Sequence, residues 1–515
     1  MLSREETEKR LREREEKVLS GDPKAVAKQH SEGKLTARER IGLLLDPESF
    51  VEEFMLAETQ VTDFGMAEKR QPTDGVVTGH GTIGGRPVYV FAQDRTVLAG
   101  AVGSAHAEKI SYVIDTARKV VVPVIGLLDS VGARIQEGLD VTRAIGKIFR
   151  SNTQASGVVP QISAIMGPCF GVASYSPALT DFTLMVKGTS QMFITSPAVI
   201  KEVLGEEITM EELGGWKVHA EQSGCSDLTA ENDEACLREI RRLLAYLPAS
   251  AREAPPRIDT GDDPNRPLDD LESLVPEDMR HPYNVLEVLR RIVDAGLFLE
   301  LKPRWARNMV IGFGRMDGQS VGFVANQPMF LAGSIDVDGA DKASRFIRFC
   351  DAFGIPIITL VDVPGFYPGK RQEQMGIIRH GAKMLYAYAE ATVPKLTVYL
   401  RKGYGGAKQA LGTREMGADQ VFVWPVELAV MGGGGAVNVL FKREIESAPD
   451  PEAARQQKLL EYAEHFSGPF EALQKQYAQA VIRPAETRRR LIQALRILAG
   501  KREEPLPRKH GVMPV

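Results

Sequence analysis

The chain repeats itself at a nearly constant spacing, and this duplication constrains its fold more than any other feature. Three segments recur: Leu98–Gly100 as Leu331–Gly333, residues 123–129 as 356–362, and residues 160–163 as 394–397. Residue numbers differ by 233 in the first two pairs and by 234 in the third. Because register is kept over such a separation, the sequence predicts two copies of one domain.

Each copy alternates short apolar strand segments with stretches that have helical spacing, such as residues 106–118 and 341–353. This alternation predicts an α/β fold. Residues 248–282 are rich in Pro, Asp and Arg and lack apolar periodicity, so we predict a linker there. The expected domains are residues 1–255 and 256–515, which fits a chain too long for one ordinary core.

Composition argues against several classes of function. The 515 residues carry a formal net charge of -4 without a polybasic block, so nucleic-acid binding is not expected. Apolar runs are too short to cross a bilayer and the N-terminal segment lacks a secretory signal, which predicts a cytoplasmic protein without membrane insertion. Four scattered cysteines without a CxxC pair predict neither disulfides nor a metal site. Residues 5–19 and 484–502 should form terminal helices that cover the core or contact a subunit.

The most informative local features are two glycine-rich turns at duplicated positions. The chain lacks the HExxH, Walker A and CxxC motifs, and we expect no GxSxG nucleophile elbow. The turns are residues 167–173 and 401–407, after strands predicted at 161–166 and 395–400. At an offset of 234 in residue number, Gly171 aligns with Gly405 and Ala173 aligns with Ala407. Both turns are predicted to lead from a strand into a helix.

Backbone N–H groups at the start of a helix attract negative charge, because they are unsatisfied donors at the positive end of the helix dipole. Two such turns can hold two oxyanions, and loss of one donor of this kind typically costs about 2.7–4 kcal/mol of transition-state stabilisation. Alternatively, the glycines only permit tight packing of helix against strand. The turns alone leave both interpretations open, and they do not distinguish a phosphate from an enolate.

Longer motifs, ordered along nearly the whole chain, point to one protein family. In the first half they are residues 30–40 (HSEGKLTARER), 74–79 (DGVVTG), 133–138 (ARIQEG) and 176–182 (SPALTDF). In the second half they are residues 361–366 (VDVPGF), 376–383 (GIIRHGAK), 386–394 (YAYAEATVP) and the turn at Tyr404. Together these motifs resemble the carboxyltransferase family typified by the propionyl-CoA carboxylase β subunit and the large transcarboxylase subunit.

The resemblance implies two duplicated crotonase-like domains, with acyl-CoA bound mainly by the first and biotin mainly by the second. It assigns the thioester oxyanion to the amides of Gly171 and Val172, and the biotin ureido oxygen to those of Gly406 and Ala407 beside Gly405. The substrate-binding residues that it implies are Ala133, Ala173, Lys408 and Gln409. Family members form hexamers, as trimers of dimers, with active sites between the first domain of one subunit and the second of another.

A partner protein is also implied. The chain has no Met-Lys-Met biotinylation motif, so biotin is expected on a biotin carboxylase or biotin carrier subunit. In this family carboxybiotin supplies CO₂ and biotin itself takes the α-proton of the thioester. The chain therefore needs no metal, and its expected contribution is to orient the reactants and stabilise two anions.

Several positions depart from the family pattern. Val131 and Val172 stand where the family has glycine, which adds bulk beside the first turn. A β-branched residue resists positive φ, so donation by the Val172 N–H requires a negative φ. Lys408 and Gln409 stand where Tyr and Asp are common in propionyl-selective members. In the family the second position abuts the acyl chain, so the identity of the acyl group stays open.

We expect the carboxyltransferase β subunit of an acyl-CoA carboxylase acting on a short- or medium-chain substrate such as propionyl-CoA. The nearest alternative is the same half-reaction in reverse, in a methylmalonyl-CoA decarboxylase or transcarboxylase subunit. Two further alternatives are a crotonase-type enzyme that uses only one turn and an inactive scaffold paralogue whose valines have disabled the first turn.

Overall fold

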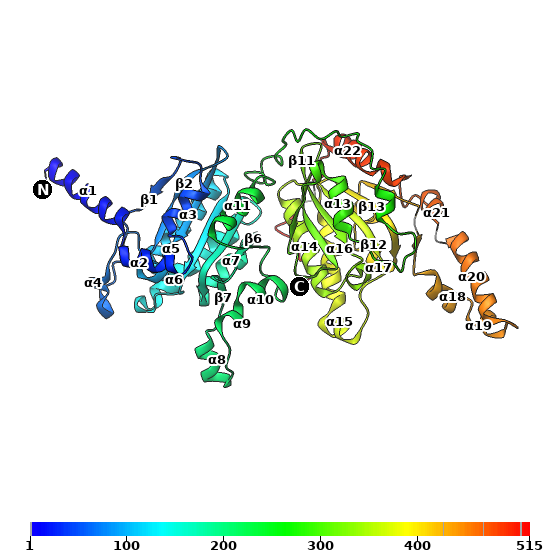
Figure 1. Ribbon diagram of the computed structural model, residues 1–515, viewed down its shortest axis with the longest axis horizontal. Helices are drawn as coiled ribbons and strands as arrows, with labels where there is room; N and C mark the ends of the chain where they lie inside the picture. Colours follow the sequence, from blue (N-terminus) through cyan, green and yellow to red (C-terminus); the bar gives the residue numbers. More distant parts are fainter. Residues whose placement is uncertain (1–2, 426, 467, 505–506, 515) are drawn as a thin grey trace. The chain divides into compact units, whose positions relative to one another are not determined.

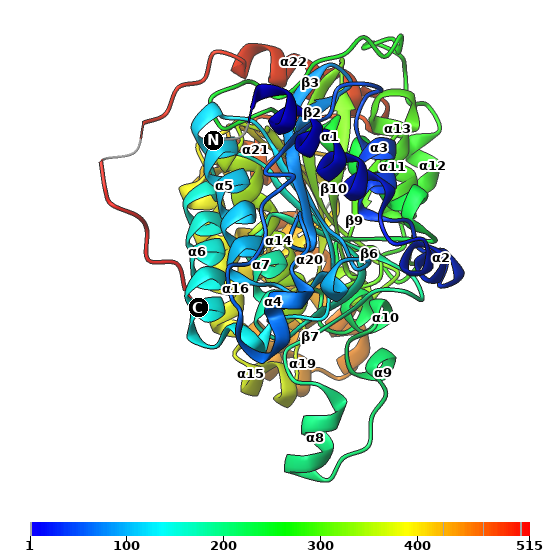
Figure 2. The same ribbon diagram turned by 90° about the vertical axis from the view of Figure 1, so that its left-hand side faces the viewer.

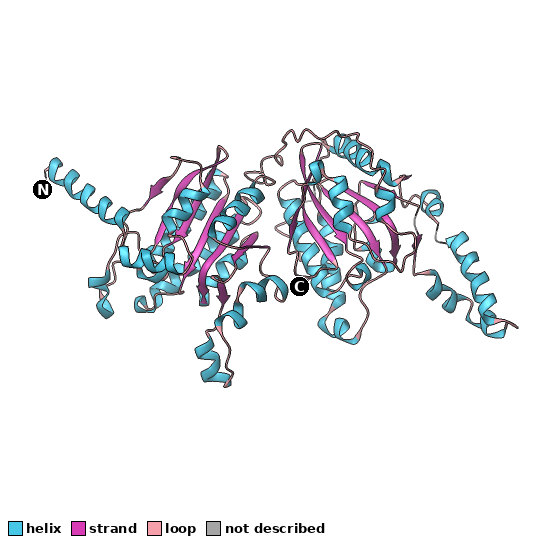
Figure 3. Ribbon diagram, in the orientation of Figure 1, coloured by secondary structure: helices cyan, strands magenta, loops and turns pink. Residues whose placement is uncertain are grey.

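The chain folds into two compact units that share one architecture. The computed structural model describes residues 3–425, 427–466, 468–504 and 507–514. Unit 1 comprises Met1–Glu253 and unit 2 comprises Ala254–Val515. In each unit, helices pack against a central sheet (Figure 1, Figure 3). Within the described part of the chain, no helix is long and apolar enough to cross a membrane.

Each unit contains an eight-stranded sheet with the same strand order. The order is β1-β2-β3-β4-β5-β6-β8 in unit 1, with β7 paired to β5, and β9-β10-β11-β12-β13-β14-β16 in unit 2, with β15 paired to β13. The strands of unit 1 are β1 Val51–Glu53, β2 Val76–Ile83, β3 Arg86–Gln93, β4 Val124–Ser130, β5 Gln161–Phe170, β6 Phe182–Val186, β7 Gln191–Phe193 and β8 Leu228–Ala230. Those of unit 2 are β9 Leu299–Leu301, β10 Met309–Met316, β11 Gln319–Asn326, β12 Ile357–Val363, β13 Lys395–Tyr404, β14 Gln420–Val423, β15 Glu427–Ala429 and β16 Ala480–Val481.

Helices surround the sheet of each unit, and several of them are short. Unit 1 has α1 Arg4–Ser20, α2 Pro23–Ser31, α3 Ala37–Leu44, α4 Met66–Lys69, α5 Ser104–Val120, α6 Leu139–Ala155, α7 Tyr175–Leu179, α8 Pro197–Leu204, α9 Met210–Gly214, α10 Trp216–Glu221 and α11 Asp233–Leu244. Unit 2 has α12 Leu271–Leu274, α13 Val285–Ile292, α14 Val337–Ala352, α15 Lys370–Met375, α16 Ile377–Glu390, α17 Gly405–Gln409, α18 Gly433–Leu440, α19 Lys442–Ser447, α20 Pro451–Phe466, α21 Pro469–Gln474 and α22 Thr487–Leu498. Figure 2 shows α8 standing away from the rest of unit 1.

Equivalent elements keep the spacing predicted from the sequence. The first residues of β2, β3, β4 and α5 differ in number by 233 from those of β10, β11, β12 and α14, and the starts of β5 and β13 differ by 234. Both copies of the Leu-Ala-Gly segment are left-handed, with φ of 51°, 54° and 63° at residues 98–100 and 49°, 52° and 80° at residues 331–333. The prediction of a duplicated α/β fold is therefore confirmed.

The strands that lead to the glycine-rich turns are longer than predicted. β5 continues to Phe170 and β13 continues to Tyr404, each four residues beyond its predicted end. The extra residues are strand because a short, later strand pairs with them, β7 with β5 and β15 with β13. The turns therefore begin only at Gly171 and Gly405.

The two terminal helices differ in role. Leu491, Ile492 and Leu495 of α22 are buried, so this helix covers the core of unit 2 as predicted. Helix α1, all of whose residues the structure describes, buries none of them. The prediction that the N-terminal helix covers the core is therefore wrong, and its alternative role in a subunit contact stays a prediction.

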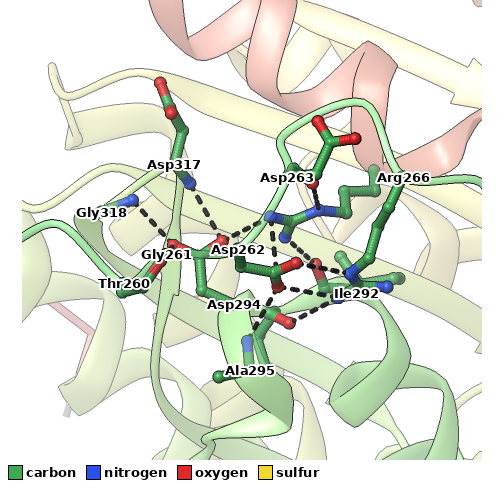
Figure 4. A network of polar contacts seen from close by, with 12 residues as sticks. Thr260, Gly261, Asp262, Asp263, Arg266, Ile292, Asp294, Ala295, Asp317 and Gly318 are labelled. Atoms are coloured by element: carbon green, nitrogen blue, oxygen red, sulfur yellow. Dashed lines mark hydrogen bonds and ion pairs between the residues drawn. The ribbon is translucent and has the colours of Figure 1, made fainter.

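In unit 2, an arginine of the last helix contacts a carboxylate that caps a hairpin turn. Arg488 Nη2 lies 2.7 Å from Asp294 Oδ1, and both side chains are fully buried. Asp294 also accepts hydrogen bonds from the amides of Asp317 at 3.1 Å and Gly318 at 2.7 Å, in the turn between β10 and β11 (Figure 4). Thr260 donates to the same carboxylate at 3.0 Å, which ties the segment after the unit boundary to the sheet.

Unit 1 repeats this arrangement in a more exposed form. Arg241 Nη2 of α11 lies 3.0 Å from Asp46 Oδ1, and the two side chains are 35% and 23% exposed to solvent. Asp46 accepts hydrogen bonds from the amides of Gly84 at 2.9 Å and Gly85 at 2.8 Å, between β2 and β3. The duplication therefore extends to tertiary contacts that the sequence comparison did not reveal.

Candidate functional site

The two glycine-rich turns have the same backbone geometry. Gly171 follows β5 with φ of +62° and begins the 3₁₀ helix Gly171–Ser174, while Gly405 follows β13 with φ of +56° and begins α17. Glycine adopts this left-handed conformation without the steric cost of a Cβ atom. The first N–H groups of each helix have no intrahelical acceptor, so they are available to a ligand. Both turns can therefore bind a negatively charged oxygen.

A second loop lies against the first turn. Val102 donates its N–H to the Gly132 carbonyl at 2.8 Å and accepts from the Arg134 N–H at 2.9 Å, forming a parallel bridge with Ala133. Because successive backbone groups of an extended chain point to opposite sides, the Ala133 N–H faces away from Val102. A Cβ atom on Gly132 would lie 2.8 Å from the Phe170 carbonyl oxygen, so this loop contacts the end of β5.

The same loop recurs in unit 2. Ile335 donates to the Gly365 carbonyl at 3.2 Å and accepts from the Tyr367 N–H at 2.8 Å, which leaves the Phe366 N–H in the position of Ala133. Phe366 was not among the site residues predicted from the sequence. The offset of 233 in residue number from Ala133 was a signal that could have found it.

A buried aspartate stands at the end of the central strand in each unit. Asp129 Oδ2 lies 3.1 Å from Arg40 Nη1 and 3.5 Å from Lys34 Nζ. Its counterpart Asp362 lies 3.0 Å from Arg401 Nε and 3.6 Å from Lys402 Nζ. Burial raises the pKa of Asp362, and the two cations oppose that effect.

The arginines that pair with these two aspartates come from different elements, for a steric reason. A Cβ atom on Gly167 would lie only 2.0 Å from Asp129 Oδ1, so this position must remain glycine and Arg40 reaches the carboxylate from α3. In unit 2 the position aligned with Gly167 is Arg401, which supplies the cation from the strand itself. In both units the aspartate fixes the strand end that carries the donor loop.

A polar network holds the Ala133 loop of unit 1. Arg134 Nη1 lies 2.7 Å from Asp74 and 2.9 Å from Glu137, and all three side chains are buried. His106 packs beside them with its Nδ1 3.0 Å from the Asp74 carbonyl oxygen. Burial, helped by the Arg134 charge, lowers the pKa of His106 to about 3, so this imidazole is neutral at ordinary pH.

The valines beside the first turn keep a backbone suited to hydrogen-bond donation. Val131 and Val172 both have negative φ, while the positive φ values fall on Gly132 at +98° and Gly171 at +62°. The condition for donation by the Val172 N–H is therefore met. The side chains are 41% and 38% exposed, so they line the accessible surface at the turn.

Lys408 and Gln409 have different surroundings. The Gln409 side-chain oxygen accepts a hydrogen bond from Thr413 at 2.7 Å, which fixes the amide. The Lys408 Nζ lies 5.3 Å from the centre of the Tyr477 ring, and the side chain lines a cavity beside α17. Burial lowers the pKa of Lys408.

One further pattern has no catalytic geometry. Residues 318–322 read Gly-Gln-Ser-Val-Gly, which matches the spacing of a serine nucleophile motif. These residues lie in the β10–β11 hairpin, where Ser320 is fully buried and donates to the Pro256 carbonyl at 3.2 Å. A nucleophile elbow requires an exposed serine between a strand and a helix, so this serine is structural.

Comparisons with known proteins agree with this geometry. The family model described as the carboxyl transferase domain matches residues 28–513. A propionyl-CoA carboxylase carboxyltransferase subunit of Haloferax mediterranei is 52% identical over 507 residues, covering 98% of each chain. A methylmalonyl-CoA decarboxylase subunit alpha of Veillonella parvula is equally similar, at 52% identity and 98% coverage of both chains. The crystal structure of the transcarboxylase 12S hexamer is 47% identical, with a TM-score of 0.98 over 100% of this chain and 99% of that one.

Together with the family match, two crotonase-like units that each carry a backbone-amide turn at the end of a central strand identify an enzyme that transfers carboxyl groups. The chain belongs to the carboxyl transferase domain family, and the resemblance inferred from its motifs is confirmed.

Proposed function

We propose that the chain is the carboxyltransferase subunit of a biotin-dependent acyl-CoA carboxylase. It would transfer a carboxyl group from carboxybiotin, carried by a partner protein, to the α-carbon of an acyl-CoA such as propionyl-CoA. The observation that carries the proposal is the pair of equivalent turns at Gly171 and Gly405, each facing a second donor loop. Two developing anions require two such sites.

In unit 1, the amides of Ala133, Gly171 and Val172 would hold the thioester oxygen, with Ala173 behind the turn. Ala173 is buried, and it packs in the same apolar core as Val102, which holds the Ala133 loop. Donors fixed in this way stabilise an enolate without reorganisation during the reaction. The role of unit 1 is therefore to bind acyl-CoA and to favour loss of its α-proton.

In unit 2, the amides of Phe366, Gly406 and Ala407 beside Gly405 suit the ureido oxygen of biotin. This oxygen accepts hydrogen bonds, and a Cβ atom on Gly406 would lie 3.9 Å from the Phe366 ring, so the donor residues lie together beside an aromatic surface. When bound, carboxybiotin supplies the carboxyl group and a base for the α-proton. The amides of unit 2 orient it and favour the charge that develops on the ureido oxygen.

We also propose how copies of the chain assemble. The 12S relative is a hexamer, and we infer a hexamer, as a trimer of dimers, for this chain. Active sites would form where unit 1 of one copy meets unit 2 of another, with a biotin carboxylase or biotin carrier subunit as the second partner. A separated monomer should then be inactive.

The test is fixation of labelled bicarbonate. Purified chain, ATP, its biotin-bearing partner and a panel of acyl-CoA thioesters should give acid-stable label in acyl-CoA. Consumption of ATP with no label in any acyl-CoA would contradict the proposal.

The reverse reaction is a second candidate, because a methylmalonyl-CoA decarboxylase subunit is as similar to this chain as the carboxylase subunit. The same turns would then remove a carboxyl group from methylmalonyl-CoA. Transfer from labelled methylmalonyl-CoA to the biotin-bearing partner, faster than the forward reaction at equal saturation, would favour this direction.

A further inference from the structure

Helix α8 of unit 1 carries apolar side chains that its own unit leaves uncovered. The helix has eight residues, Pro197–Leu204, and buries none of them. Val199 is 45% exposed, Val203 is 72% exposed and Leu204 is 66% exposed. A helix this short gains little stability from its backbone alone, so helices of this length depend on packing of an apolar face. The exposed apolar face of α8 therefore marks a contact surface.

This helix is tethered to the unit 1 turn. Strand β7 pairs with the last residues of β5, directly before Gly171. Ile194 follows β7, and a Cβ atom on Gly171 would lie 3.9 Å from the Ile194 carbonyl oxygen. Ile194 is itself 54% exposed, and α8 begins at Pro197. A surface that contacts α8 would therefore be held close to the unit 1 turn.

Helix α15 follows the donor loop of unit 2, and Figure 1 shows it at one end of that unit. It spans Lys370–Met375, comes shortly after Phe366 in the chain and buries none of its residues. Gln372 accepts a hydrogen bond from the Val337 N–H at 2.9 Å, which fixes α15 against the start of α14. The nearby Ile378 side chain is 81% exposed. Unit 2 therefore also presents an uncovered apolar side chain close to its donor loop.

Helix α8 and the segment that follows it are acidic. Residues 201–212 contain five glutamates and a single lysine, Lys201, which pairs with Glu207 at 2.6 Å. Glu202 and Glu206 are exposed, and neither forms an ion pair with any residue that the structure describes. The surface of α8 therefore offers two carboxylates to a cation from elsewhere.

Helix α15 has the opposite charge. Lys370 and Arg371 are exposed, and neither lies in an ion pair within the described ranges of the chain. Arg371 acts on Asp338 only through space, opposing the burial that raises the pKa of this carboxyl group. The two cations of α15 are therefore available to carboxylates of another surface.

Helices α18–α20 of unit 2 form a rival contact surface, since Val439 is 70% exposed and Leu440 is 61% exposed. Residues 442–461 contain five acidic and four basic residues, so this surface is close to neutral. It offers the acidic α8 no excess of positive charge. Charge complementarity therefore favours α15 as the surface that meets α8.

We propose that α8 of one copy packs against α15 of a second copy, with the glutamates of α8 facing Lys370 and Arg371. The inference rests on the proposed function, because this contact would bring the unit 1 turn of one copy to the unit 2 turn of the other. Burial of the exposed apolar side chains favours association, and the opposite charges select which surfaces meet. A single chain would then lack half of each site.

The first test reverses the charge of one helix at a time. A chain with Lys370→Glu and Arg371→Glu is acidic on both surfaces, and a chain with Glu202→Lys and Glu206→Lys is basic on both. Each change should raise the dissociation constant of the assembly about tenfold or more, because like charges then meet at the contact. Mass photometry over a dilution series measures these constants.

Mixing the two variant chains is the decisive step. In a mixed complex every acidic surface meets a basic one, so assembly and carboxylation should both return to near the wild-type level. A contact within one chain would not be restored by mixing, because the two surfaces of each chain still carry the same charge. A mixture that stays dissociated would overturn the proposal.

The matched control makes the same charge change on the rival surface. Lys442 and Arg443 of α19 are exposed, and Lys442→Glu with Arg443→Glu should leave the dissociation constant unchanged. A loss of assembly as large as that of the α15 variant would assign the contact to α19. If the α15 variant stays assembled but fixes less bicarbonate with the biotin-bearing partner, α15 belongs to that partner. Either result contradicts the proposal.

A neutral variant tests the same contact if a reversed chain fails to fold, as thermal melting would show. The wild-type dissociation constant should rise with ionic strength, because salt screens exposed charges. Lys370→Ala with Arg371→Ala should remove most of this salt dependence. An unchanged salt dependence would count against the contact.

These outcomes are separate from failure of the proposed function. If the wild type assembles but carboxylates no acyl-CoA, the proposed function fails. If the wild type carboxylates acyl-CoA and both reversed chains keep its dissociation constant, the contact between α8 and α15 fails.

Discussion

The two turns of this enzyme have the same backbone but different side chains. Gly171 and Gly405 adopt nearly identical left-handed conformations. The following donor is Val172 in unit 1 and Gly406 in unit 2, whereas the donor on the facing loop is Ala133 in unit 1 and Phe366 in unit 2. Duplication has therefore preserved the backbone amides that we propose stabilise charge. The bulkier side chain lies on the turn in unit 1 and on the facing loop in unit 2, so the two sites differ in shape, as the proposed binding of two different reactants requires.

The largest expected difference between the units is in stability. Arg488→Met should lower the free energy of unfolding of unit 2 by about 3–5 kcal/mol, because it leaves the fully buried Asp294 charge without its cation. Arg241→Met should have a smaller effect on unit 1, since water reaches that pair. Chemical denaturation of both variants measures the difference. Equal losses would contradict the role assigned to burial.

The turn glycines provide the next comparison. Gly171→Val and Gly405→Val should each lower kcat by about 10²–10³, because the strained turn misplaces the donors that follow it. Gly188→Val is the matched control, since Gly188 also has a positive φ, of 75°, but lies between β6 and β7 with open space around it. A comparable loss of kcat in the control would show that strain alone, and not donor position, causes the effect.

Acid should weaken unit 1 through His106, whose counterpart in unit 2 is Gly339. The folded-state pKa is about 3 against an ordinary value of 6.5, so the unfolded chain binds more protons between these values. The contribution of the neutral His106 to the free energy of unfolding of unit 1 is fully present above pH 6.5. It is lost as pH falls, by about 2 kcal/mol between pH 7 and pH 5. His106→Asn should flatten the pH dependence of unit 1 unfolding. The same acid slope in variant and wild type would contradict this account.

Val172→Gly should have the smallest effect. The valine already keeps a negative φ, so its removal should change kcat by less than about fivefold, the scale of a glycine's added flexibility. Kinetics with propionyl-CoA measure this directly. If the wild type were inactive and Val172→Gly restored activity, the chain would be the scaffold paralogue instead.

The sequence predicted the parts of the fold that depend on local pattern and on the repeat. The constant offset between the two copies located both sheets and both turns, including Gly171 and Gly405. Strand ends were missed because pairing by β7 and β15 depends on residues later in the chain. The Arg241 and Arg488 contacts were missed because the difference in residue number between these arginines departs from that offset. The cavity beside Lys408 was missed because its walls come from residues 428–477, which lie later in the chain than the turn.

The proposed assignment of the thioester to the unit 1 turn and of biotin to the unit 2 turn is tested most directly by measuring ligand binding to the two turn variants. Titration calorimetry with propionyl-CoA and with biotin methyl ester on assembled protein should show that Gly171→Val weakens only the thioester and Gly405→Val weakens only the biotin ester. If both substitutions weaken the same ligand, or each weakens both equally, the assignment of one anion to each unit is contradicted.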